Sequence, residues 1–312
     1  MSDRPVILVF GAINHDEVAR VPRHPMPGET VVTGSIEFFQ GGKGANQAYA
    51  AANAGGSRVS VQMVGAVGDD AAGQAAVDSL AAAGVDTTLV KQVIDRPTGR
   101  AYITVSDDGQ NTIVVGLGAN AYVSPSNLVL AQRPDVAVAQ TELGSAAVEA
   151  LCAFAVEVGA RLIINDGPAV PLSVAALRAA DPLVVNQHEA LDLMGLDTWE
   201  GEQAALAAEL RARHDVRSVI ITLGSEGSVV ADAHGARAHP PVAARRVVDT
   251  TGAGDTFVGA LSVGLALGED IDSAVALASA AAARSVEWKG ARAPLAPPAG
   301  GRRARQAGLP AH

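Results

Sequence analysis

Near the end of the chain stands Asp249-Thr250-Thr251-Gly252-Ala253-Gly254-Asp255-Thr256-Phe257, a glycine-rich stretch that decides the fold prediction. A β-branched run, Arg246-Val247-Val248, precedes it, and an apolar run with helical spacing continues from Phe257 to Leu265. This order predicts a strand, then a glycine turn, then a helix.

The glycine turn has the features of an anion site. Gly252 and Gly254 lack the Cβ atoms that would keep a ligand away from the backbone. The free amides and the dipole of a helix N-terminus then favour an anion such as phosphate. Asp255 lies in the same turn, where a carboxylate would repel phosphate unless it has a chemical task, such as accepting the proton of an attacking hydroxyl. The alternative is that Asp255 or Thr251 only caps the helix.

Two other phosphate motifs are excluded. A dinucleotide fingerprint needs a third glycine where Phe257 stands, and the run after the first apolar strand, Gly11-Ala12-Ile13-Asn14, also lacks it. This argues against a nicotinamide dehydrogenase. A P-loop needs a hydroxyl residue after Gly-Lys, which Gly42-Lys43-Gly44 does not provide.

The composition predicts a globular enzyme. The 312 residues are 48% hydrophobic and 18% charged, enough to build a large core. The net charge of −10 argues against sequence-independent nucleic-acid binding. Cys152 is the only cysteine and is expected in the core, so an internal disulfide is excluded. The sequence shows neither a signal peptide nor a membrane-spanning run, and a cytoplasmic location is expected.

Short β-rich runs alternate with alanine-rich helical stretches over most of the chain. This alternation predicts an α/β fold, with a doubly wound and mostly parallel central sheet flanked by helices. The expected strands are residues 6–11, 59–65, 136–141, 161–166, 183–186 and 219–224.

A second, smaller sheet is expected beside the first. Residues 30–39 have strand character, and residues 98–105 and 112–115 flank a hairpin turn, Asp107-Asp108-Gly109-Gln110. Together they predict a small antiparallel β lid, formed by about residues 12–40 and 96–120, that would exclude water from the cleft. We expect one domain over residues 1–296 and a flexible Pro/Gly/Arg-rich tail over 297–312.

Polar residues follow several of the expected strands, where α/β proteins bind ligands. Asn186 and Glu189 are candidates to hold phosphate oxygens and, through water, Mg²⁺. Gly42, Lys43 and Asn46, at the start of a helix, are candidates to bind hydroxyl groups of a polar ligand. The other candidates at strand ends are Asn14, Asp16, Glu142, Asn165 and Asp166.

Two stretches, Gly41-Gly42-Lys43-Gly44-Ala45-Asn46-Gln47-Ala48 and Asp249–Phe257, resemble the signatures of the ribokinase family of carbohydrate kinases. The resemblance extends from Gly11 to Ala291 and is strongest to the ribokinases within the family. It implies an ATP-dependent kinase that phosphorylates the primary hydroxyl of a pentose, converting D-ribose to D-ribose 5-phosphate. Deoxyribose, a ketohexose or a nucleoside remain alternative acceptors, and a sugar-sensing protein without turnover is a further alternative.

The resemblance also implies roles for individual residues. Asp255 is the catalytic base, and the amides of Gly252, Ala253 and Gly254 stabilise the transferring phosphoryl group. The implied sugar-binding residues are Asn14, Asp16, Gly42, Lys43, Asn46, Glu142 and Asp255. The implied nucleotide-binding residues are Asn186, Glu189, Thr222, Leu223, Gly224, Ser225, Glu226, Gly227, Gly254 and Ser279, with Mg²⁺ held at Glu189 through water.

The same resemblance implies a monovalent cation, normally K⁺, and a homodimer formed through the lid. The cation ligands would come from Asp249, Thr251, Ser285, Trp288 and Gly290. Two positions depart from the family pattern: Ser279 stands where a histidine is common, and Ala293-Pro294 stands where the cation loop commonly ends in serine.

Overall fold

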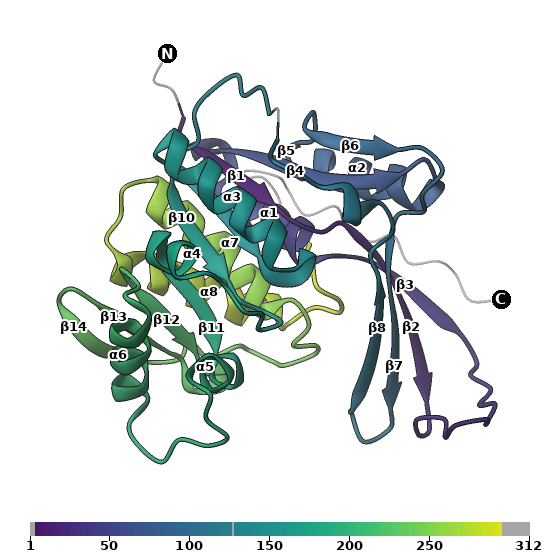
Figure 1. Ribbon diagram of the computed structural model, residues 1–312. Coiled ribbons are helices and arrows are strands. Elements are labelled where there is room, and N and C mark those ends of the chain that lie inside the picture. Colours follow the sequence, from purple (N-terminus) through teal and green to yellow (C-terminus); the bar gives the residue numbers. More distant parts are fainter. Residues whose placement is uncertain (1–3, 127, 295–312) are drawn as a thin grey trace, which may run out of the picture.

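The computed structural model describes residues 4–126 and 128–294. The tail prediction for residues 297–312 lies outside these residues. The central sheet runs in the order β14-β13-β12-β11-β10-β9-β1-β4-β5, with β6 also paired to β4 (Figure 1). Its strands are β1 (Val6–Phe10), β4 (Ser60–Gly68), β5 (Val85–Asp86), β6 (Val90–Val93), β9 (Val136–Gln140), β10 (Arg161–Asn165), β11 (Ala180–Asn186), β12 (Val219–Thr222), β13 (Ser228–Asp232) and β14 (Gly235–His239).

All pairs from β12 to β5 are parallel, and only β13 and β14 are antiparallel. The doubly wound, mostly parallel sheet is therefore confirmed. Its central strands are apolar throughout because both of their faces are covered: all five residues of β1 are buried. Successive side chains of β1 enter opposite cores, with Ile7 and Val9 on one face and Leu8 and Phe10 on the other.

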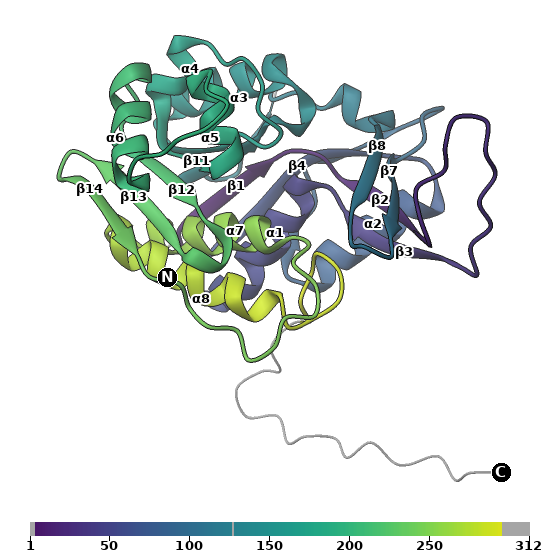
Figure 2. The same ribbon diagram turned by 90° about the horizontal axis from the view of Figure 1, so that it is seen from below.

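Four helices cover each face of the sheet (Figure 2). One layer consists of α1 (Lys43–Gly55), α2 (Ala71–Ala82), α7 (Ala253–Ala266) and α8 (Ile271–Ser285). The opposite layer consists of α3 (Ser145–Val158), α4 (Val174–Ala179), α5 (Gln187–Met194) and α6 (Gln203–His214). Cys152 lies buried on α3, as expected. No helix in the described part of the chain combines the length and apolar character that a membrane span requires.

The predicted lid is a four-stranded sheet that projects from one end of the central sheet (Figure 1). It consists of β2 (Asn14–Val21), β3 (Ile36–Gly41), β7 (Gly99–Ser106) and β8 (Asn111–Gly116), in the order β3-β2-β7-β8. The outer pairs are antiparallel, but β2 and β7 are parallel because two separate excursions of the chain meet there. Residues 30–35 are not a strand, so this part of the lid prediction was wrong: β2 takes the place beside β3.

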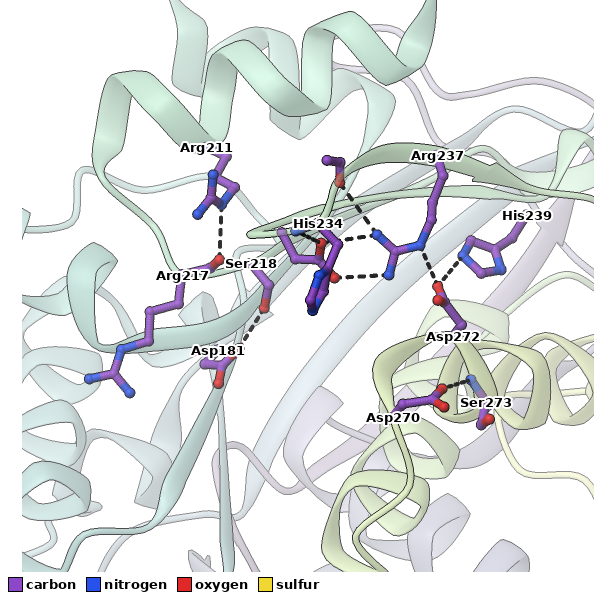
Figure 3. A network of polar contacts seen from close by, with 12 residues as sticks. Asp181, Arg211, Arg217, Ser218, His234, Arg237, His239, Asp270, Asp272 and Ser273 are labelled. Atoms are coloured by element: carbon purple, nitrogen blue, oxygen red, sulfur yellow. Dashed lines mark hydrogen bonds and ion pairs between the residues drawn. The ribbon is translucent and has the colours of Figure 1, made fainter.

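Two further differences concern the edge of the central sheet. Residues 246–248 form an exposed loop instead of the expected strand, because the antiparallel hairpin β13–β14 already completes this edge. The hairpin itself was not predicted. Arg237 on β14 donates hydrogen bonds to Asp232 on β13 and to Asp272 on α8, which ties the hairpin to the helical layer (Figure 3).

Helices α1 and α7 approach each other closely in the same layer. A Cβ atom on Gly259 of α7 would lie only 2.6 Å from the Gln47 carbonyl oxygen and 2.7 Å from the Ala50 Cβ of α1. Glycine at this position therefore lets the two helix backbones pack against each other. As a result, the first turns of α1 and α7, which carry both family signatures, lie side by side.

Candidate active site

The site lies where the strand order of the sheet reverses. The chain passes from β1 to β4 on one side and later returns to β9 on the other side of β1. In such sheets, ligands bind beyond the carboxyl ends of the strands at this switch point. Asn14, which follows β1, and Glu142, which follows β9, meet there. The side-chain amide of Asn14 donates a hydrogen bond of 3.0 Å to Glu142 Oε1.

Glu142 links the start of β2 to the start of α1. Its Oε2 accepts a hydrogen bond of 2.8 Å from the backbone amide of Lys43, at the start of α1. Burial raises the pKa of this carboxyl group, while the Lys43 amide and ammonium group lower it. Asn120 was not predicted as a site residue, but its side-chain amide donates to Asn14 Oδ1 at 2.8 Å. Asn120 thus forces the Asn14 amide nitrogen toward Glu142.

Asp255 lies in the first turn of α7, and only 6% of its surface is exposed. Its Oδ2 accepts from the Asn46 side-chain amide at 3.0 Å, and its Oδ1 accepts from Gln47 Nε2 at 3.1 Å. Lys43 Nζ lies 3.9 Å from Oδ1. The N-cap of α7 is Gly252 and has no side-chain capping bond, which excludes the capping alternative for Asp255 and Thr251.

The glycine turn has the geometry that its sequence predicts. Gly252 has φ = 73°, and a Cβ there would lie 2.5 Å from the Ala291 carbonyl oxygen, so only glycine fits. Apart from its neighbours in the same helix, no heavy atom of the described residues lies within 4 Å of a Cβ built on Gly254, which leaves space for a ligand beside the backbone. The Ala253 amide donates to the Thr250 carbonyl at 3.2 Å within the turn.

Gln47 was part of the quoted signature but not of the predicted site. Its amide nitrogen donates to Asn165 Oδ1 at 3.0 Å as well as to Asp255, and its Oε1 accepts from Gln140 at 2.6 Å. Gln140 thereby fixes the donor end of Gln47 toward the carboxylate. Only the tertiary contacts reveal this arrangement, because residues 47, 140 and 165 are far apart in sequence.

Asp16 lies on β2 and faces the other acidic groups of the site. Its Oδ1 is buried without a hydrogen-bond partner, which suits an oxygen that accepts from a ligand hydroxyl. The pKa of Asp16 is raised to about 7, mainly by burial and then by the charge of Glu142; the charge of Arg292 lowers it and that of Asp255 raises it.

Arg292 is a second residue that the sequence pattern did not single out. Its side chain is half-buried and donates from Nε to Asn46 Oδ1 at 3.0 Å. Burial lowers its pKa to about 10, so it is charged at neutral pH. The ammonium of Lys43 faces Asp255, Glu142 and Glu189, and the charge of Asp255 raises its pKa most.

Asn186 and Glu189 form a capping box at the start of α5. Glu189 Oε2 accepts a hydrogen bond of 2.7 Å from the backbone amide of Asn186. In return, Asn186 Oδ1 accepts a hydrogen bond of 2.8 Å from the backbone amide of Glu189. The pKa of Glu189 is raised by burial and lowered by Lys43. Residues 4–126 and 128–294 contain no cluster of three or more His, Cys, Asp or Glu side chains suited to a metal ion. One carboxylate beside a ligand phosphate is nevertheless enough for a largely hydrated Mg²⁺.

The predicted nucleotide loop follows β12. Gly224–Glu226 forms a 3₁₀ turn, and the Leu223 amide donates to the Gly227 carbonyl at 2.9 Å. Gly224, Ser225 and Glu226 are exposed, and Thr222 lies at the end of the strand beside Asn186 of β11. Ser279 is half-buried on α8.

The predicted cation residues come from two adjacent loops. Asp249 accepts hydrogen bonds from the amides of Thr251 and Gly290, both at 2.9 Å, and so joins them. Burial raises the pKa of Asp249, but these hydrogen bonds outweigh it and the net pKa is lowered. The Trp288 amide donates to the Ser285 carbonyl at 3.2 Å. A cavity of about 550 Å³ lies between these loops and the inner face of the lid, and Asp16 lines it.

The raised pKa of Asp16 predicts a pH-dependent effect of Asp16→Asn on stability. Between pH 4 and 7 the folded state holds a proton on Asp16 that the unfolded chain has released, so this group destabilises the protein as the pH rises through that window. Asparagine does not titrate, so the variant does not lose this stability as the pH rises. Scanning calorimetry should therefore give Asp16→Asn a higher Tm than the wild type at pH 8, and the difference should shrink toward pH 4. Substitution of the exposed Asp197 by asparagine is the control, and a Tm difference independent of pH would contradict the expectation.

Known proteins resemble this chain over nearly its full length. The model of the pfkB family of carbohydrate kinases matches residues 5–298. Ribokinase from Haemophilus influenzae is 34% identical over 297 residues, which cover 94% of this chain and 95% of that protein. Ribokinase from Bacillus subtilis is 36% identical over 284 residues, covering 90% of this chain and 92% of that protein.

Solved structures of kinases are also similar to this chain over most of its length. Arabidopsis thaliana ribokinase complexed with ribose and ATP superposes with a TM-score of 0.82 at 29% identity, covering 93% of this chain and 94% of that chain. Burkholderia thailandensis nucleoside kinase in complex with inosine gives 0.75 at 25% identity, covering 92% of this chain and 91% of that chain. With both signatures in one site and a family match over almost every residue, the chain belongs to the pfkB family of carbohydrate kinases.

Proposed function

We propose that this carbohydrate kinase transfers the γ-phosphoryl group of ATP to the primary hydroxyl of D-ribose, giving D-ribose 5-phosphate. The observation that carries the proposal is the buried Asp255 carboxylate, held by Asn46 and Gln47 at the open glycine turn. The similar Arabidopsis ribokinase was solved with ribose and ATP, which supports both substrates. The use of ATP also favours a cytoplasmic location, which stays a prediction.

The geometry supports a division of tasks within the site. Asp16, Asn14 and Glu142 present acceptors and donors for sugar hydroxyls on the lid side. Asp255 accepts the proton of the attacking hydroxyl, because its two oxygens are already oriented by neutral amides. The turn from Gly252 to Gly254, with Lys43, would stabilise charge on the transferring phosphoryl group. ATP and a Mg²⁺ near Glu189, with residues 222–227 and Ser279 around the nucleotide, complete the proposal.

A nucleoside is the second candidate acceptor, because a nucleoside kinase shares the fold at 25% identity. A coupled assay for ADP release at fixed MgATP will compare D-ribose, deoxyribose, fructose and adenosine. We expect the highest kcat/KM with D-ribose. If another acceptor matches or exceeds ribose, the ribose assignment is wrong while the kinase assignment stands.

Replacement of Asp255 by asparagine tests the proposed base. The amide keeps the size of the side chain and cannot accept the proton, so kcat should fall by roughly 10²- to 10⁴-fold. Ribose binding, measured by titration calorimetry, should stay within a few fold of the wild type. Turnover close to that of the wild type would remove Asp255 as the base.

We propose a monovalent-cation site between the two loops that Asp249 joins. Ligands would be the carboxylate or carbonyl oxygens of Asp249, Thr251, Ser285, Trp288 and Gly290. Because the glycine turn directly follows Thr251, an ion there would order the amides that face the phosphoryl group. Turnover should rise severalfold when K⁺ replaces tetramethylammonium at constant ionic strength, and equal rates in both salts would exclude an activating site.

We propose that two lids pair to form a homodimer. The outer face of the lid exposes Phe38, Tyr102 and Val114, of which Phe38 is 61% and Val114 is 68% exposed. These residues lie in one row across the sheet: Tyr102 and Val114 are direct neighbours, and Glu17 of β2 stands between Tyr102 and Phe38. Exposed apolar side chains grouped on one face favour a protein contact. Light scattering should show a dimer for the wild type and a monomer for Val114→Asp. The equally exposed Val156 on α3 provides the control, since Val156→Asp should remain dimeric; a monomeric wild type would contradict the proposal.

A further inference from the structure

Residues Lys289 to Arg292 lie in the loop that follows α8, which ends at Ser285, and form a strap beside the site. Lys289 pairs with Glu37 on lid strand β3, and the Gly290 amide donates to Asp249 at 2.9 Å. Ala291 packs directly on the glycine turn, since its carbonyl oxygen lies 2.5 Å from a Cβ built on Gly252. The strap therefore contacts the lid, the cation loop and the catalytic turn in succession and ends at Arg292.

Arg292 occupies a built site formed by three elements. Its Nε donates to Asn46 Oδ1 at 3.0 Å, its Nη2 to the Gly41 carbonyl at 3.3 Å and its Nη1 to Ser79 Oγ at 3.3 Å. The guanidinium also lies over the Tyr49 ring, 5.5 Å from the ring centre. A half-buried, planar cation with partners on several sides has little freedom to move.

The hydrogen bond from Arg292 determines the orientation of the Asn46 amide. A primary amide has one accepting end and one donating end, whereas a guanidinium can only donate. With Oδ1 directed at Arg292, Asn46 must direct Nδ2 at Asp255, where it donates at 3.0 Å. A flipped amide would place an oxygen against the carboxylate and lose both hydrogen bonds.

The charge of Arg292 opposes a cluster of acids. Asp16 faces Glu142, Asp255 and Arg292, and Arg292 is the one positive charge among these three neighbours. The second cation of the site, Lys43, is half-buried and faces Asp255, Glu142 and Glu189 instead. Removing Arg292 would therefore leave Asp16 opposed by two acids.

We propose that Arg292 is a positioning residue of the sugar site, which locks the Asn46 amide against Asp255 and supplies the positive charge that counters the acids around Asp16. It does not contact the reacting atoms and acts through these two residues. The proposal rests on the proposed sugar-kinase function, and it assigns a task to a residue more than 240 positions away from Asn46 in the chain.

The test compares Arg292→Gln and Arg292→Lys with Arg217→Gln, a matched control at an exposed arginine whose side chain points away from its neighbours (Figure 3). Arg292→Gln should lower kcat/KM for ribose at pH 7 by about 10- to 100-fold, as expected for losing charged hydrogen bonds. The acid limb of its pH profile should move to higher pH, since Asp16 then binds its proton more tightly. Arg292→Lys should keep the limb near its wild-type position but still lose kcat, because an ammonium lacks the planar fork.

A substrate-free measurement separates this proposal from the proposed function. In protein labelled at aspartate Cγ, with the signal assigned through Asp16→Asn, the NMR titration midpoint of Asp16 should rise in Arg292→Gln and stay unchanged in Arg217→Gln. If the wild type phosphorylates no sugar, the proposed function fails, and this titration still reports on Arg292. An unchanged midpoint in Arg292→Gln overturns the electrostatic role.

The orienting role has its own decisive outcome. Wild-type kcat in Arg292→Lys would show that the fork does not orient Asn46, and this variant keeps a cation in place should Arg292→Gln fail to fold. Added guanidinium at millimolar concentration should restore part of the turnover of Arg292→Ala, while methylammonium should not. Restoration by both ions, or by neither, would contradict an orienting guanidinium.

Discussion

The close packing of α1 on α7 is the constraint on which the site depends. Asp255 is buried at the start of α7, and a buried carboxylate is costly unless it is fully hydrogen-bonded. Both of its amide donors, Asn46 and Gln47, come from the first turn of α1. They reach it because Gly259 allows the two helix backbones to touch. A single packing distance thus decides whether the candidate base is solvated, mispaired or held ready to accept a proton.

Neutral amides, rather than cations, make most of the contacts to the carboxylates. Because each amide has a defined donor end and acceptor end, orientation passes along a series of hydrogen bonds. Gln140 orients Gln47 toward Asp255, and Asn120 orients Asn14 toward Glu142. Amides fix the geometry without forming the short ion pair that would weaken a base, and Lys43 stays 3.9 Å from Asp255.

The sequence predicted what depends on local pattern. Buried parallel strands such as β1 are apolar runs, and the glycine turn before Asp255 has a conformation that only glycine adopts readily. Strand β2 was missed because its residues from His15 to Glu17 are polar and partly buried, so their pairing with β3 and β7 leaves no alternating signal. The run at 246–248 has strand propensity but no edge to join, which is a tertiary property.

The site residues likewise fall into those that the sequence pattern predicted and those that only the structure revealed. Those in the two signatures were predicted by type and spacing, and the structure brings Asn46, Lys43 and Asp255 together. Asn120 and Arg292 could not be found, because an asparagine or an arginine has no spacing rule and acts here through partners that are distant in sequence. Asn186 and Glu189 were predicted for phosphate and Mg²⁺; the structure shows that they form a capping box, and their role toward phosphate and Mg²⁺ stays a prediction.

The balance of charge explains why the two halves of the site suit different ligands. On the lid side, Asp16, Glu142 and Asp255 face only two cations, Lys43 and Arg292. An acceptor that brought its own phosphate there would meet an excess of negative charge, whereas a neutral polyol brings only hydroxyl donors. At the glycine turn the preference for ligand charge is the opposite, because backbone amides and the N-terminus of α7 favour an anion. Asp255 lies at the boundary, where the proposed base would have a neutral alcohol on one side and a phosphoryl group on the other.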